Sequence, residues 1–341
     1  MKQAIHQVVG REHLTYAQAK EVMHHLLGGD ATEAQTASFF TALRMKGETI
    51  DEIAGLAAVL REKATSFTPD VPFHVDTCGT GGDGVNTFNI STAATFVAAA
   101  AGVKIAKHGN RAISSKSGSA DVLEALGIDI ALEAHDVKKS VEEFGLGFMF
   151  ARVFHKHMAL VSKVRGDLSM RTVFNILGPL SNPSNAKGQF MGVFDGALTT
   201  CIANVMMKLG VTHGLVVHGK DGLDEITTTT ETIVAEIKNG EIIEYMLTPE
   251  QFGLERATID QLRGGDATEN AQIIVDIFKG EKGAKRDIVG LNAGAIIYIG
   301  KQAKSLSEGV KIAQQVIDNG LALEKLQQFT QYTEKLKEVS V

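Results

Sequence analysis

A glycine-rich connection between a short apolar strand and a helix constrains the fold of this chain more than any other feature. Residues 76–92 read Asp-Thr-Cys-Gly-Thr-Gly-Gly-Asp-Gly-Val-Asn-Thr-Phe-Asn-Ile-Ser-Thr and contain four glycines, two carboxylates and five hydroxyls. Glycines let backbone N–H groups approach phosphate oxygens closely, and a helix that begins near Ser91 adds the positive end of its dipole. The hydroxyls of Thr87, Ser91 and Thr92 can bind phosphate or metal. The segment therefore predicts a phosphate-binding loop between a strand and a helix.

Two common nucleotide-binding loops fit this segment poorly. Glycines at 79, 81 and 84 match the dinucleotide fingerprint, but a lone match of this kind is weak. That fingerprint needs an acidic residue at the end of the next strand, whereas the expected strand 103–106 runs into Lys-His-Gly-Asn-Arg. A basic strand end suits a second phosphate. No Gly-x-x-x-x-Gly-Lys-Ser/Thr string occurs in the chain, which excludes a P-loop.

Composition indicates a soluble globular protein. The chain has 341 residues, enough for two domains, and 44% of them are hydrophobic. A formal net charge of -6 argues against broad nucleic-acid binding. Cys78 and Cys201 do not make a disulfide framework, and no secretory signal is visible, so we expect a cytoplasmic protein. The longest apolar stretch, 93–103, is much shorter than the roughly 20 residues of a membrane span and predicts a buried helix.

The first part of the chain, residues 1–66, has helical patterning throughout. Thr15 can cap a helix that ends at Leu27, and Thr32 with Gln35 can start another that ends at Met45. A third helix is expected over 50–64. Prolines at 69 and 72 then mark a break, so we expect a small all-helical domain here.

Residues 70–341 alternate short apolar strands with helices, which predicts an α/β domain with a central, mostly parallel sheet flanked by helices. Asn239-Gly240 predicts a hairpin between the last two strands. Ligands in such sheets bind beyond the carboxyl ends of the strands, where we expect the loops at Gly79, Lys107 and His218 to converge. The expected strands are 74–78, 103–106, 148–150, 188–193, 214–218, 232–237 and 241–246, and helices are expected over 92–101 and 119–126.

Three further polar clusters carry chemistry when read together with the glycine-rich loop. Residues 107–119 are rich in serine and lysine and precede a helix capped near Ser119; alone they indicate a polar loop, but beside the first loop they predict a second phosphate site. Asp224 and Glu225 follow an apolar strand; alone they indicate an ordinary acidic surface turn, but beside two predicted phosphate loops these hard oxygen ligands predict a Mg²⁺ site. Arg165 and Arg171 can bind a carboxylate, although an arginine on a helix is usually solvated.

Paired histidines do not predict a metal site. His155 and His157 have no cysteine or third ligand nearby, so surface positions are favoured for both. The same interpretation applies to His24 and His25.

These clusters together resemble one family over nearly the whole chain, the anthranilate phosphoribosyltransferases. The matching segments are Gly-Thr-Gly-Gly-Asp at 79–83, Asn-Ile-Ser-Thr at 89–92, Lys-His-Gly-Asn-Arg at 107–111, the run 115–127, Arg-Thr-Val-Phe-Asn-Ile-Leu-Gly-Pro-Leu at 171–180, Leu-Asp-Glu at 223–225, Gly-Gly-Asp-Ala at 264–267 and Glu-Asn-Ala at 269–271. A joint match of this kind is very specific.

The resemblance implies transfer of a 5-phosphoribosyl group from 5-phosphoribosyl 1-pyrophosphate to anthranilate in tryptophan biosynthesis. It implies a Mg²⁺ site at Ser91, Asp224 and Glu225, with two ions per subunit, and anthranilate contacts at Gly79, Asn110 and Arg165. It also implies a homodimer joined through the helical domain, to which helices around 165–183 would belong, and no nucleic-acid or membrane partner. Lys107 would help to stabilise charge. The residues implied for the phosphoribosyl donor are Gly79, Gly82, Asp83, Thr87, Asn89, Ile90, Ser91, Thr92, Lys107, His108, Gly109, Asn110, Arg111, Ser114, Ser115 and Ser119.

A few positions depart from the family pattern. Arg152 stands where proline is usual, Lys156 and His157 replace Pro-Ala, and 227–231 replace a run containing Gly-Pro-Thr. They affect acceptor entry and loop geometry more than the class of reaction. Two alternatives stay open: a pyrimidine nucleoside phosphorylase, which would need inorganic phosphate, and a nucleic-acid-binding relative, which should be basic and have lost parts of the loops.

Overall fold

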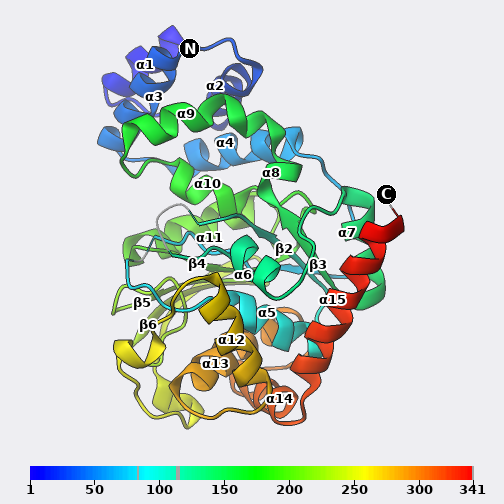
Figure 1. Ribbon diagram of the computed structural model, residues 1–341. Coiled ribbons are helices and arrows are strands. Elements are labelled where there is room, and N and C mark those ends of the chain that lie inside the picture. The colour runs from blue at the N-terminus through cyan, green and yellow to red at the C-terminus, as the bar shows by residue number, and fades with distance from the viewer. Residues whose placement is uncertain (83, 113–115, 340–341) are drawn as a thin grey trace.

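The computed structural model describes residues 1–82, 84–112 and 116–339, and it has a helical domain at one end and an α/β domain at the other (Figure 1). The N-terminus lies in the helical domain, and the last helix runs along the side of the α/β domain. Asp83, Ser114 and Ser115, which were expected to contact the donor, lie outside the described residues.

The helical domain begins with four consecutive helices, three of which start at threonine caps. They are α1 (Lys2–Val9), α2 (Tyr16–Gly28), α3 (Glu33–Lys46) and α4 (Ile50–Lys63). Thr15 and Thr32 each form a capping box with the glutamine three residues later, which confirms both predicted helix starts. Thr49 does the same with Glu52. Each box satisfies backbone donors that would otherwise have no partner in the helix.

Later segments of the chain return to this domain. After α8 (Ala151–Phe154), α9 (Ala159–Leu168) packs against α2 and α3, and α10 (Phe174–Leu180) packs against α4. Phe174 of α10 lies with its ring centre 4.3 Å from that of Phe40 in α3. The same buried core continues through α11 (Thr199–Lys208) to one face of the sheet. The helical domain is therefore fixed to the α/β domain by shared packing.

The central sheet has the order β3-β2-β1-β4-β5-β6-β7 among the described residues. Strands β1 to β5 pair in parallel, while β6 and β7 are antiparallel, which confirms the mostly parallel sheet. Asn239 and Gly240 both have positive φ, 55° and 80°, as the predicted hairpin turn requires. The strands are β1 (Val75–Asp76), β2 (Ile105–Gly109), β3 (Leu146–Phe150), β4 (Gly188–Gly192), β5 (His213–Gly219), β6 (Thr232–Lys238) and β7 (Glu241–Leu247).

Two strand boundaries differ from the prediction for identifiable reasons. Strand β1 ends at Asp76, because the Asp76 carboxylate accepts a 2.8 Å hydrogen bond from the backbone N–H of Thr77 and the chain leaves the ladder. Strand β2 continues to Gly109, since Lys107 and His108 pair with Phe148 and Met149 of β3. Their polar side chains suggested a loop, and that prediction is wrong.

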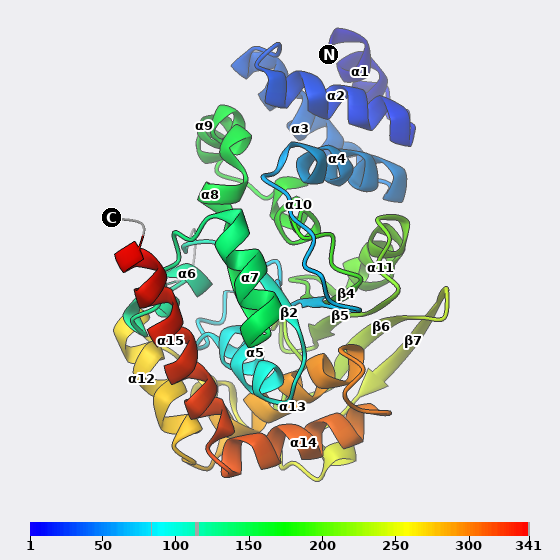
Figure 2. The same ribbon diagram turned by 90° about the vertical axis from the view of Figure 1, so that its right-hand side faces the viewer.

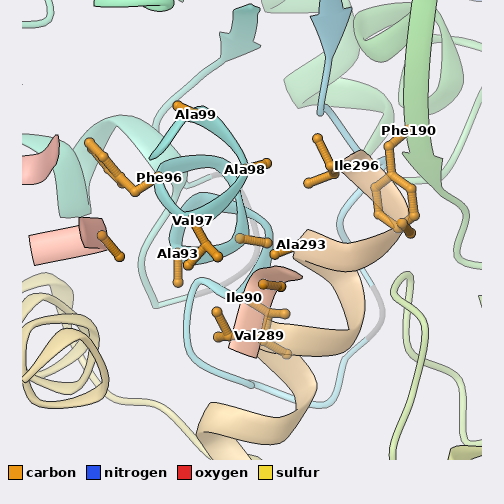
Figure 3. Close-up of a cluster of buried hydrophobic side chains, with 14 of the residues drawn as sticks. Ile90, Ala93, Phe96, Val97, Ala98, Ala99, Phe190, Val289, Ala293 and Ile296 are labelled. Atoms are coloured by element: carbon orange, nitrogen blue, oxygen red, sulfur yellow. The ribbon is translucent and has the colours of Figure 1, made fainter. Parts of the chain in front are cut away.

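Helices cover both faces of the sheet, and the alanine-rich segment forms the buried helix α5 (Ile90–Ala100), as predicted. Figure 3 shows α5 packed against α13 (Ala284–Ile299), with Ala93 and Val97 facing Ala293 and Val289. Small side chains let these helices approach closely. The remaining helices are α6 (Ser119–Ala125), α7 (Ala134–Phe144), α12 (Ala267–Phe278), α14 (Leu306–Asp318) and α15 (Leu321–Val339), the last visible beside α12 in Figure 2.

None of the helices within the described residues is long and apolar enough to cross a membrane.

Candidate donor and metal site

The glycine-rich loop lies directly against Asp224, as the topology predicts for loops that follow β1 and β5. The backbone N–H of Gly81 donates a 2.7 Å hydrogen bond to Asp224 Oδ2. A Cβ added at Gly79 would lie 2.9 Å from the same oxygen, and one added at Gly192 would lie 1.5 Å from the Asp224 carbonyl oxygen. Glycine is needed at both positions because the backbone and a carboxylate meet there without room for a side chain.

The glycine-rich loop is also anchored to the end of β4. Thr80 donates its backbone N–H to the Gly192 carbonyl at 2.9 Å, and its hydroxyl accepts from the N–H of Phe194 at 3.1 Å. Gly81 and Gly82 have positive φ, 63° and 76°, a conformation that other residues adopt only with strain. The loop is thus held at its base, while its turns depend on glycine.

An arginine from the helical side reaches the tip of this loop. The Arg171 guanidinium donates to the carbonyl of Gly82 and lies 4.3 Å from the ring centre of Phe194. The sequence singled out Arg171 as a possible carboxylate ligand and as the first residue of the matched segment 171–180. Its contact with the loop could not be anticipated, because it depends on how α9 and α10 return to the helical domain.

The residues available for Mg²⁺ fit that ion. Asp224 is half-buried and Glu225 is buried, and both follow β5 in the predicted loop. Ser91 lies in the first turn of α5, immediately after the glycine-rich loop. No group of three or more His, Cys, Asp or Glu side chains in the described ranges could hold a metal alone. Mg²⁺ commonly completes its shell with water and substrate phosphates, so two carboxylates at the edge of the glycine-rich loop are a suitable set.

The second loop is closed by Asp121 of α6. Its Oδ2 accepts the N–H groups of Ala112 and Gly118, each at 2.9 Å. Gly118 is the N-cap, and a Cβ there would lie 2.4 Å from the Ala112 nitrogen. The helix begins at Ser119, which confirms the predicted cap near that residue, and the loop needs glycine at the cap position itself.

Arg111 is already paired with protein carboxylates. One guanidinium nitrogen lies 3.0 Å from Asp121, and the other donates to Glu124 at 2.8 Å. The hydrogen bond to Glu124 is the main cause that raises the pKa of Arg111. The side chain of Arg111 thus stabilises the loop. Asn110 is exposed beside it, and its carbonyl lies 3.4 Å from the Ser119 hydroxyl.

Lys107 and His108 point to opposite faces of β2, and both are buried. The Lys107 ammonium contacts the carbonyl and hydroxyl oxygens of Thr77. The His108 ring lies 5.0 Å from that of His155, and burial lowers its pKa well below the usual value. His155 is 7% exposed, so the predicted surface position is wrong for it, whereas His157 is exposed.

Other predicted positions fall as follows. His218 lies in β5, as the expected strand 214–218 has it, and its Nδ1 is 2.8 Å from the Val193 carbonyl oxygen. His24 and His25 have side chains exposed by 44% and 41%, as expected. Ile90 and Thr92 are buried in α5, so Ile90 can offer only backbone atoms to a ligand.

Asn89 joins the two loops to a third segment. Its amide donates to the Ser117 carbonyl at 3.1 Å, and its Oδ1 accepts from Asn270 at 2.9 Å. This third segment is residues 264–271, in which Asn270 accepts the N–H of Gly265 at 2.8 Å. Thr87 forms an isolated β-bridge with Arg263, the residue just before the segment. Sequence reasoning assigned Asn270 no role, although its place in a matched motif was a signal.

Arg165 approaches from α9, away from both loops in sequence. It is half-buried, and its guanidinium lies 4.9 Å from the ring centre of Phe174. Burial lowers its pKa, yet arginine stays protonated at neutral pH. A partly desolvated guanidinium attracts a carboxylate more strongly than one in water.

Comparisons with known proteins agree with this architecture. Models of the glycosyl transferase family match twice: the helical bundle domain over residues 2–64 and the a/b domain over residues 72–323. The fold and the glycine-rich site thus define a glycosyl transferase with both domains of that family.

Full-length relatives narrow the family. The chain is 55% identical over 333 residues to the anthranilate phosphoribosyltransferase of Acetivibrio thermocellus, covering 98% of this chain and 96% of that one. The crystal structure of the Thermus thermophilus enzyme is 43% identical, with a TM-score of 0.92 over 97% of this chain and 99% of that one. The Saccharomyces cerevisiae enzyme in complex with PRPP and Mg is 29% identical, with a TM-score of 0.87 over 94% of both chains. The chain belongs to the anthranilate phosphoribosyltransferase family.

Proposed function

We propose that this protein transfers the 5-phosphoribosyl group of 5-phosphoribosyl 1-pyrophosphate to the amino group of anthranilate, giving N-(5-phosphoribosyl)anthranilate and pyrophosphate in tryptophan biosynthesis. The observation that carries the proposal is the contact between the glycine-rich loop and Asp224, because it brings a loop suited to phosphate oxygens against a carboxylate suited to Mg²⁺. Similarity over the full length of named relatives supports the same reaction.

The chemistry divides into departure of pyrophosphate and attack by an amine. Bond breaking at C1 of the ribose leaves a positively charged, oxocarbenium-like sugar, which the anthranilate nitrogen attacks; that nitrogen then loses a proton. Backbone N–H groups of the loops at 79–92 and 107–119 would bind the phosphate oxygens, and Ser91, Asp224 and Glu225 would hold Mg²⁺. When bound, Mg²⁺ neutralises charge on the leaving pyrophosphate. Positioning and charge stabilisation therefore supply most of the catalysis.

The acceptor would bind between the two domains. Arg165 would form a charged hydrogen bond with the anthranilate carboxylate, while Gly79 and Asn110 would contribute from the two loops. Arg165 is suited to this role because it is half-buried, so its positive charge is less screened by water, and arginine stays protonated at neutral pH. The proposal also includes two Mg²⁺ ions per subunit and a homodimer joined through the helical domain. Light scattering on the purified protein would test whether it is a dimer.

The direct test is loss of anthranilate fluorescence after mixing the protein with 5-phosphoribosyl 1-pyrophosphate and Mg²⁺, with EDTA and protein-free controls. We expect a decrease that needs both the protein and the metal. A protein that binds the donor but leaves the fluorescence unchanged would contradict anthranilate as the acceptor. Phosphorolysis of uridine or thymidine with inorganic phosphate would instead support the nucleoside phosphorylase.

A further inference from the structure

A buried chain of hydrogen bonds lies beneath the glycine-rich loop and connects its two ends. Its members are Lys107, Thr77 and Thr95, with side chains that are almost completely enclosed: Thr77 is 0% exposed, Thr95 2% and Lys107 3%. Thr77 stands at the start of the loop, and Thr95 lies one turn beyond Ser91 at its end. Contact with a substrate does not account for the burial of two threonines and a lysine together here.

The direction of each hydrogen bond follows from the number of available protons. The Thr95 hydroxyl donates its single proton to the Ser91 carbonyl at 2.7 Å. In the 2.8 Å contact between the Thr95 and Thr77 hydroxyls, Thr77 must therefore be the donor. The Thr77 hydroxyl oxygen then accepts from the Lys107 ammonium at 3.3 Å. The bonds run in one direction, from the ammonium to the Ser91 carbonyl.

Aligned hydrogen bonds in a low-dielectric interior strengthen one another, and an unpaired member would be costly. The positive end of this chain is fixed because Lys107 also donates to the Thr77 carbonyl. The backbone of Thr77 is fixed in turn by Asp76, whose carboxylate accepts the N–H groups of Thr77 at 2.8 Å and His108 at 3.0 Å. Strand β2 thus holds both the beginning of the loop and the first turn of α5.

We propose that Thr77 and Thr95 are positioning residues that hold Ser91 in the geometry needed for donor and metal binding. The inference rests on the role proposed for Ser91. Neither threonine needs to touch the substrate, since they act through the Ser91 carbonyl and the first turn of α5. Lys107 contributes to the site through the same chain of hydrogen bonds.

The protein offers a matched control for the loss of one buried hydroxyl. Thr36 of α3 is 4% exposed and donates the same kind of bond to a carbonyl four residues earlier, at 3.0 Å from Thr32. Thr95→Val and Thr36→Val both remove a hydroxyl with little change in shape. Only Thr95→Val is expected to raise the KM for 5-phosphoribosyl 1-pyrophosphate and the Mg²⁺ concentration for half-maximal rate, each by about tenfold, because the hydrogen bond to the Ser91 carbonyl is lost and the Thr77 hydroxyl loses its acceptor. The KM for anthranilate should stay the same, and Thr95→Ser should restore wild-type values.

Two results would overturn the proposal. One is a Thr95→Val protein with wild-type donor KM and Mg²⁺ dependence. The other is an equal rise in donor KM for Thr95→Val and Thr36→Val, which would indicate general loss of stability. If Thr95→Val does not fold, Thr95→Ala, which favours helix, is measured with the same expectation. Ser91→Ala separates the role proposed for Ser91 from the positioning role of Thr95. If Ser91→Ala keeps wild-type Mg²⁺ dependence, the proposed role of Ser91 fails. If Ser91→Ala is defective and Thr95→Val is normal, only the positioning role is refuted.

Discussion

Gly79→Ala perturbs the contact between the glycine-rich loop and Asp224 with a single methyl group. The added Cβ would lie 2.9 Å from Asp224 Oδ2 and 3.4 Å from the Gly192 carbonyl oxygen. The first distance is too short for a carbon and an oxygen, so the Asp224 carboxylate must move. The backbone of Gly79 does not have a positive φ, so alanine brings no conformational strain of its own.

The magnitude follows from the hydrogen bond that is lost when the carboxylate moves. Asp224 Oδ2 accepts from Gly81 N–H at 2.7 Å, and a hydrogen bond to a charged group contributes about 1.5–3 kcal/mol. If this interaction is needed in the transition state, kcat/KM for the donor falls roughly ten- to a hundredfold. Protein stability changes little, because Gly79 lies in a partly exposed loop.

The assay is the initial rate of anthranilate fluorescence loss at several donor concentrations, with thermal unfolding measured beside it. Gly290→Ala is the control: it lies inside α13, where an added Cβ meets only an ordinary contact at 3.8 Å. That variant should keep full activity. A Gly79→Ala protein with wild-type kcat/KM would refute the reasoning that the loop and the carboxylate work as one site.

Two further variants test the site, and a third tests the burial of His155. Arg171→Lys keeps the charge but loses the forked donor to Gly82 and the stacking on Phe194, so the KM for the phosphoribosyl donor should rise about tenfold. Arg44→Lys, on the exposed side of α3, should have no effect, and equal KM values for the two variants would contradict a role of the Arg171 contact in donor binding. The double variant Asp224→Ala/Glu225→Ala should lower turnover at least about a hundredfold with little change in anthranilate affinity. The control Glu241→Ala/Glu244→Ala on β7 should keep normal turnover, and normal turnover of the first variant at saturating Mg²⁺ would refute the metal role of Asp224 and Glu225. Burial lowers the pKa of His155 to about 4, so between pH 6.5 and 4 the unfolded chain binds a proton at this residue and the folded protein does not. Acidification from pH 6.5 to 4 should therefore lower the unfolding free energy of the wild type by on the order of 3 kcal/mol more than that of His155→Gln. Parallel pH profiles of stability for the two proteins would contradict this prediction.

Local patterns in the sequence were sufficient for most elements of the fold. The caps at Thr15 and Thr32, the hairpin at Asn239-Gly240 and the alanine-rich α5 all depend on neighbours close in sequence, and all are confirmed. The meeting of the Gly79 and Asp224 loops followed from topology, because parallel strands end at one edge of the sheet.

The errors concern polar residues whose burial depends on distant partners. The charge of Lys107 indicated a solvent-exposed loop residue. In the fold its ammonium is buried, because it donates to the Thr77 carbonyl and lies near the opposite charge of Asp76. His155 looked exposed for the same reason, although His108 lies beside it. Contacts such as Arg171 to the tip of the glycine-rich loop join residues almost ninety positions apart, and no local pattern encodes them.

Calorimetric titration of 5-phosphoribosyl 1-pyrophosphate into the protein, with Mg²⁺ and then with EDTA, tests most directly whether the glycine-rich loop and the carboxylates after β5 form one donor site. We predict binding that is at least about tenfold tighter with Mg²⁺ in the wild type, and no such difference in Asp224→Ala/Glu225→Ala. Equal donor affinity in all four titrations would contradict a metal site at these carboxylates.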